Sequence, residues 1–179
     1  MRWRPARQHL YKQLFEDANW LVEFGLRGHR EELPDVWYRF GYISYGTKGL
    51  DRSFAKKLSA LPVSALYEEV KAFADEPDML ASFKRELDAD LEHSATIFLA
   101  REPELNRLIG QLREHISYFE GSLEIYREAR ASGRDPAARL GSSAIDQAGI
   151  ALKEVIFSAF WLRSWLAEHA DSVEPHPTG

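Results

Sequence analysis

The sequence predicts an all-α protein: a single-domain helical bundle of six or seven helices, with three long helices in the carboxy-terminal half. Two hydrophobic ladders with alternating steps of four and three residues support this fold, because that spacing keeps one stripe of a helix against a neighbouring helix. The first ladder consists of Leu105, Ile109, Leu112, Ile116, Phe119, Leu123 and Tyr126, and the second of Ile145, Ala148, Leu152, Val155, Ala159, Leu162 and Leu166.

The first sixty residues predict three shorter helical segments. Residues 5–24 begin with a proline, which suits an opening turn, and Gly25 follows them as a helix end. Residues 34–45 mix helical and strand-like spacing, but we favour a helix because no partner strand is recognisable elsewhere. Residues 50–61 carry leucine and phenylalanine at helical spacing and end before Pro62.

The rest of the chain predicts four more helices. A serine is expected to cap the helix over 64–73, and a longer helix follows over 78–100. Prolines in the first turn open two long helices, over 103–131 and 136–170. We expect the three long helices to form the core, with the aromatic amino-terminal third covering them.

The domain is expected to span residues 1–170, because residues 171–179 lack apolar periodicity and resemble a disordered tail. The net charge of -5 divides into +4 over residues 1–60 and -9 over the remainder, and 11 of the 22 aromatic residues lie in the first sixty. This asymmetry indicates either a binding face or two parts of one bundle that attract each other, and we favour the second.

The composition indicates a cytoplasmic protein with no membrane partner. The chain has no cysteine, which suits a reducing compartment and removes disulfides and thiolate metal sites. Its amino terminus lacks the apolar core of a secretory signal. The longest apolar stretch, residues 150–166, is interrupted by charged and polar side chains and is too short for a membrane span.

One candidate metal site lies in the acidic run that contains Glu86, Asp90 and His93. Carboxylates and imidazole on one helix can ligate iron, manganese or zinc. A di-iron bundle requires Glu-x-x-His on two helices and a glutamate from each of two more, and only Asp90 to His93 approximates that motif here. We therefore favour a solvated acidic face, and predict no metal and no cofactor.

Arg163 and His169 form a candidate catalytic pair on the final helix. Their spacing resembles the Arg-x(4 to 6)-His pattern of HEPN domains, all-helical modules that include dimeric ribonucleases. The resemblance implies that the pair would act on an RNA backbone, with the histidine placed for acid–base chemistry. Ser164 stands where that family usually has Asn, Asp or His. The alternative is a histidine that faces the helix dipole.

An aromatic and basic segment is the third candidate site. Aromatic faces and cations together bind single-stranded nucleic acid, and here they are supplied by Trp37, Arg39, Tyr42, Tyr45, Lys48 and Arg52. Because the chain is acidic overall, we favour a core role for the aromatic residues, with the cations at its margin. Trp37, Tyr42 and Tyr45 could also line a small-ligand pocket with Trp161.

The last candidate is an interface on the final helix, formed by Trp161 and Trp165, which lie one turn apart beside the apolar stripe. Either this helix is covered on all sides, or the tryptophans form a protein interface, where tryptophan is enriched. The sequence thus favours a non-catalytic helical interaction or regulatory module that forms a homo-oligomer and can bind a protein partner. A HEPN-like ribonuclease or a small-ligand binder is the alternative, and nucleic acid is not a favoured partner.

Overall fold

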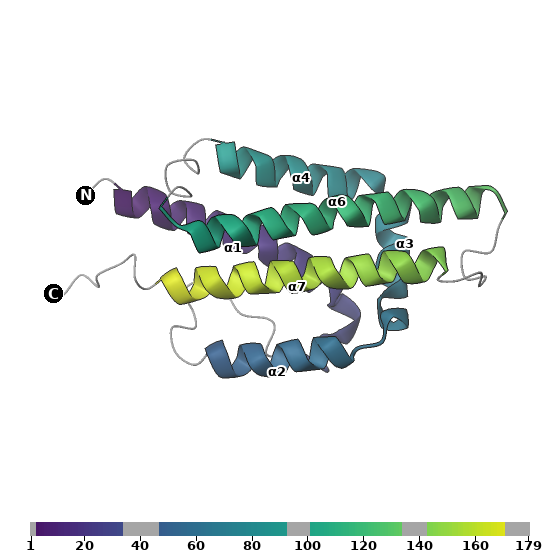
Figure 1. Cartoon of the computed structure of the whole chain (residues 1–179), viewed down its shortest axis with the longest axis horizontal. Helices are drawn as coiled ribbons and strands as arrows, with labels where there is room; N and C mark the ends of the chain where they lie inside the picture. The colour runs from purple at the N-terminus through teal and green to yellow at the C-terminus, as the bar shows by residue number, and fades with distance from the viewer. Residues whose placement is uncertain (1–2, 34–46, 93–100, 134–142, 171–179) are drawn as a thin grey trace.

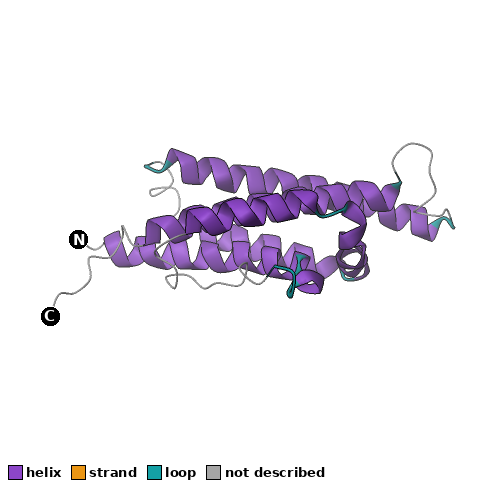
Figure 2. Cartoon of the chain, turned by 90° about the horizontal axis from the view of Figure 1, so that it is seen from below, coloured by secondary structure: helices purple, strands orange, loops and turns teal. Residues whose placement is uncertain are grey.

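The computed structural model describes residues 3–33, 47–92, 101–133 and 143–170, and these are almost entirely helical (Figures 1 and 2). They form six α-helices and two short 3₁₀ helices, without a strand among the described residues. In chain order the elements are α1 (Trp3–Gly25), η1 (Arg27–His29), α2 (Thr47–Ala60), η3 (Val63–Leu66), α3 (Tyr67–Asp75), α4 (Pro77–Glu92), α6 (Pro103–Ala131) and α7 (Ala144–Ala170). The predicted all-α helical bundle is confirmed.

Four of the helices, α1, α4, α6 and α7, run alongside one another as an antiparallel bundle (Figure 1). Contacts between adjacent helices run in opposite residue order. The pairs are Tyr11–Trp165 and Asn19–Arg163 between α1 and α7, Asp17–Asp90 and Trp20–Phe83 between α1 and α4, and Lys84–Glu120 and Asp88–Arg113 between α4 and α6. The antiparallel order places the apolar stripes of all four helices on one shared core.

Helix α7 is the central element of this bundle, because it contacts α1, α2, η3, α3 and α6. Its ladder is fully enclosed, and Leu152 in the middle of that ladder is 1% exposed. Helix α1 contributes an equally buried stripe with Leu14, Ala18 and Val22. The expectation that the amino-terminal third only covers three later helices is therefore wrong: α1 is a full member of the bundle.

Helices α2 and α3 lie outside the four-helix core. Helix α2 follows the side of α7, where the Phe54 and Phe160 rings are 4.2 Å apart and Lys153 Nζ donates to the carbonyl oxygen of Leu61 (2.6 Å). Helix α3 runs across one end of the bundle (Figures 1 and 2). The link between them approaches α7 closely, since a Cβ added to Gly149 would lie 2.4 Å from Cγ1 of Val63.

Two predicted helix starts are wrong. Ser64 does not cap a helix, because it lies inside η3, and Leu66 precedes α3 without a side-chain cap. The final helix begins at Ala144, where the Ser143 hydroxyl accepts from the Asp146 amide (3.2 Å) and donates to the Asp146 carboxylate (2.8 Å). Because Ser143 caps the helix at this point, the predicted helix over 136–170 is not one unbroken helix.

Several sequence predictions fall on residues that the structure does not describe. They concern the helix over 34–45, the end of the helix over 78–100, the proline-opened turn near residue 136, and the tail over 171–179. Within the described part, the two long carboxy-terminal helices follow their ladders closely. Ile116 is 1% exposed, as its ladder position predicts.

Candidate functional site

Four large apolar side chains are exposed on the described surface, and all belong to α6 and α7. Tyr118 is 64% and Ile125 60% exposed on α6, and Ile150 is 42% and Trp161 43% exposed on α7. Scattered apolar side chains are normal on protein surfaces, but a group confined to two adjacent helices indicates a contact surface.

Helical geometry gathers these side chains on one surface. Tyr118 and Ile125 are two turns apart, and Ile150 and Trp161 are three turns apart, so each pair shares one side of its helix. The hydrogen bond between His115 Nδ1 and Ser158 Oγ marks where α6 meets α7. Because α6 and α7 are antiparallel, Tyr118 lies one turn from this contact in one direction along the helix pair, and Trp161 lies one turn from it in the other direction. We call Tyr118, Ile125, Ile150 and Trp161 the outer α6–α7 face.

One polar pair joins the two helices beneath this face, and a second buried serine bonds within α6. Ser158 is buried and contacts His115, while Ser122 is buried and donates to the Tyr118 carbonyl oxygen (3.1 Å). A serine beside a histidine is a potential nucleophile and base, but catalysis also needs a group that orients the imidazole and room for a substrate. Ser158 is only 6% exposed, and no described carboxylate bonds the other ring nitrogen of His115. The arrangement suits helix packing.

The two tryptophans of the predicted interface have different surroundings. Trp165 is part-buried, packs edge-on against Tyr11 of α1 at a centroid distance of 5.6 Å, and stacks on His169 at 3.7 Å. Trp161 contacts the Phe160 ring at a centroid distance of 5.0 Å and is 43% exposed. Trp161 is therefore the more accessible of the two tryptophans, on the exposed side of the central helix α7.

Arg163 and His169 differ in their described surroundings. Arg163 is fully buried, its Nη1 donates to Asn19 Oδ1 (2.7 Å), and its guanidinium lies 5.7 Å from the Phe160 ring centroid. His169 lies in the last turn of α7, where its Nδ1 donates to the Trp165 carbonyl oxygen (2.7 Å). A guanidinium enclosed in the core is not positioned to contact an RNA backbone.

The acidic candidates lie near Asp17, which the sequence analysis did not select. Glu86 is exposed and Asp90 is part-buried on α4, and His93 lies outside the described residues. Asp17 of α1 faces both carboxylates. Burial, hydrogen bonding to Asp90 and the charges of Asp90, Glu86 and Glu16 raise the pKa of Asp17 to about 8. The described residues contain no group of three or more side chains placed to hold a metal ion.

The aromatic and basic candidates lie mostly outside the structure's description. Trp37, Arg39, Tyr42 and Tyr45 fall among the residues that are not described, and of Lys48 only its place in α2 is described. Arg52 is exposed on α2. Whether this segment belongs to the core or to a binding site stays a prediction.

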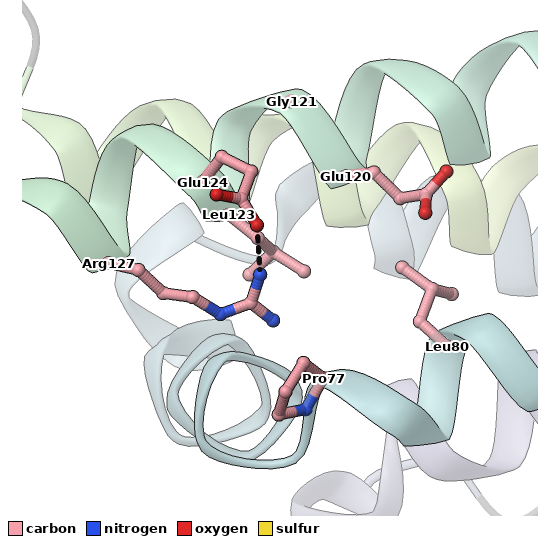
Figure 3. Close-up of a pocket in the computed structure, with 7 residues that line it drawn as sticks. All are labelled: Pro77, Leu80, Glu120, Gly121, Leu123, Glu124 and Arg127. Atoms are coloured by element: carbon pink, nitrogen blue, oxygen red, sulfur yellow. Dashed lines mark hydrogen bonds and ion pairs between the residues drawn. The ribbon is translucent and has the colours of Figure 1, made fainter.

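A groove of about 290 Å³ lies between α4 and α6 (Figure 3). It is lined by Pro77, Leu80, Glu120, Gly121, Leu123, Glu124 and Arg127. The Arg127 guanidinium pairs with Glu124 (2.9 Å) and also donates to the Phe73 carbonyl oxygen (3.0 Å), and Glu120 pairs with Lys84 (2.6 Å). Each of the three charged side chains in the lining therefore has an ion-pair partner among the described residues.

Comparisons with protein-family models, with curated proteins and with solved structures find no match for this chain. None of the helices in the described part of the chain combines the length and apolar character that crossing a membrane requires. The function must therefore be inferred from the surface of the bundle.

Proposed function

We propose that this protein is a non-catalytic helical interaction module that binds another protein chain through the outer α6–α7 face. One observation carries the proposal: the four large apolar side chains that the bundle leaves exposed lie together on two adjacent helices. Exposed aromatic and β-branched side chains on a rigid helical surface supply the buried centre of protein interfaces. We place the module in the cytoplasm, which suits a chain without cysteine.

Helix packing supports a surface that is ready for binding. Beneath the outer α6–α7 face, both helices are held by their buried ladders, in which Ile116 and Leu152 are each 1% exposed. The exposed side chains therefore project from a backbone that does not have to order when a partner binds, which lowers the entropic cost of association.

A second copy of the chain is the first occupant to test, and sedimentation velocity tests it. If copies associate, the sedimentation coefficient of wild type rises with concentration, and a Tyr118→Ser, Trp161→Ser variant remains a monomer. Both substitutions lie on the surface, so circular dichroism should show unchanged helicity and melting. Trp165 is left intact because it packs against Tyr11. A dimer that persists in the variant would place the interface elsewhere and contradict the proposal.

A further inference from the structure

The outer α6–α7 face is bordered by carboxylates. Glu114, Glu128, Glu154 and Glu168 are exposed on the same two helices, each one or two turns from an exposed apolar residue. None of the four forms an ion pair with a described residue. The face therefore has an apolar centre and a negative margin.

The basic side chains of these two helices are already engaged. Their described partners are Glu104 for Arg107, Asp88 for Arg113, Glu124 for Arg127, Asp75 for Arg130, the Ser59 and Leu61 carbonyl oxygens for Lys153, and Asn19 for Arg163. Most of these partners lie on other helices or one turn away on the same helix. Lys153 donates only to neutral carbonyl oxygens and interacts electrostatically with Glu154, so Glu114, Glu128 and Glu168 are the margin carboxylates without a described cationic partner on α6 or α7.

This charge pattern distinguishes between two candidate partners, a second copy of the chain and a protein of opposite charge. A twofold pair would bring the glutamate margins of two copies together, and like charges across an interface oppose association. A partner with lysine or arginine beside its apolar residues would be attracted to the margin and would fill the centre. Charge complementarity therefore favours a basic partner.

The shape of α6 favours a helical partner. Gly121 lies between Tyr118 and Ile125 in the sequence, at the edge of α6 that also lines the α4–α6 groove, and a Cβ added there would meet no atom within 4 Å. Because a glycine with open space beside it separates these two large side chains, α6 leaves room there for an apolar side chain from a crossing helix.

We propose that the outer α6–α7 face docks a basic amphipathic helix of a partner protein, with the apolar side of that helix on Tyr118, Ile125 and Trp161 and its cations on the glutamate margin. This inference rests on the proposed function and adds the chemical class of the partner. It differs from self-association in its response to salt, since screening weakens attraction to a cationic helix and weakens repulsion between two copies.

The probe is a fluorescein-labelled amphipathic peptide of leucine and lysine, and the matched control peptide carries glutamate in place of lysine. Fluorescence anisotropy should show binding of the lysine peptide only. The dissociation constant should rise at least about tenfold between low salt and about 1 M NaCl, where the screening length is about 3 Å.

Substitutions locate the site. Trp161→Ser should weaken binding of the lysine peptide about tenfold or more, and the Glu114→Gln, Glu154→Gln pair should weaken it about three- to tenfold. A charge-matched control, Glu31→Gln with Glu76→Gln, removes two exposed carboxylates outside the face and should change binding by less than about twofold.

Sedimentation velocity of the same samples separates the outcomes. Binding of the lysine peptide that the face variants weaken supports the inference. Absence of peptide binding, together with a wild-type dimer that Trp161→Ser dissociates, overturns the basic partner and leaves the proposed function standing. A monomer that binds neither peptide overturns both. Peptide binding that the control pair weakens as much as the face pair also overturns the inference, because the attraction would then follow net charge alone.

Discussion

Asp17 is the group whose ionisation should affect stability most clearly. Its carboxyl lies between α1 and α4, its Oδ2 atom is buried without a hydrogen-bond partner, and Asp90 and Glu86 face it from α4. Burial, the first cause, and these neighbours raise the pKa of Asp17 to about 8.

The sign of the pH effect follows from this raised pKa. Between the unfolded pKa of about 4 and the folded pKa, the folded chain binds a proton that the unfolded chain has lost, so the free energy of unfolding falls as pH rises. The full shift corresponds to about 6 kcal/mol as an upper limit. Solvent reaches part of this carboxyl and screens its neighbours, so we expect about 1 to 3 kcal/mol of stability to be lost by pH 8.

The Asp17→Asn substitution removes the ionisable carboxyl group and keeps a side chain of nearly the same shape. The variant should exceed wild type in free energy of unfolding by about 1 to 3 kcal/mol at pH 8 and by less than about 0.5 kcal/mol at pH 4.5. Urea unfolding at both pH values measures this difference. Asp78→Asn, an exposed change in the first turn of α4, is the control and should differ from wild type equally at both pH values. A difference between Asp17→Asn and wild type that does not change with pH would refute the reasoning.

Three further predictions concern packing and chemistry. Ile116→Ala and Leu152→Ala, both at buried ladder positions, should each lower the free energy of unfolding by about 2 to 5 kcal/mol in urea titrations, and a loss below about 1 kcal/mol would contradict their burial. Gly149→Ala should destabilise by about 1 to 3 kcal/mol because its methyl meets the η3 helix, whereas the open Gly110→Ala should stabilise by about 0.5 to 1 kcal/mol; equal thermal shifts would contradict this. Wild type should not cleave RNA, and cleavage that His169→Ala abolishes would restore the nuclease alternative.

The hydrophobic ladders predicted the two long helices well. Their four-three spacing follows from packing one side of a helix against the core, and that spacing is directly visible in the sequence. Helix α6 was placed at 103–131 from Pro103 and its ladder, and the structure has Pro103–Ala131. The start of α7 was missed because Pro136 and Ser143 are both acceptable openings in local terms. In the structure, Ser143 and Asp146 form the cap at which the helix begins.

The candidate site was only partly predictable, because exposure depends on which helices pack against each face. Trp161 and Trp165 share one side of α7 in the sequence, yet α1 places Tyr11 over Trp165 and leaves Trp161 open. The sequence does not distinguish Tyr118 and Ile125 as exposed, since their two-turn spacing also fits a buried stripe. Asp17 was missed because its partners are on α4, more than sixty residues away along the chain.

An NMR titration of ¹⁵N-labelled protein with the leucine–lysine peptide shows whether the outer α6–α7 face is the docking surface. We expect the largest chemical-shift changes at the Ile125 amide and the Trp161 indole N–H, with small changes at Leu80 and Lys84 of α4. Shift changes centred on Leu80 and Lys84, or spread evenly over the bundle, would contradict this expectation.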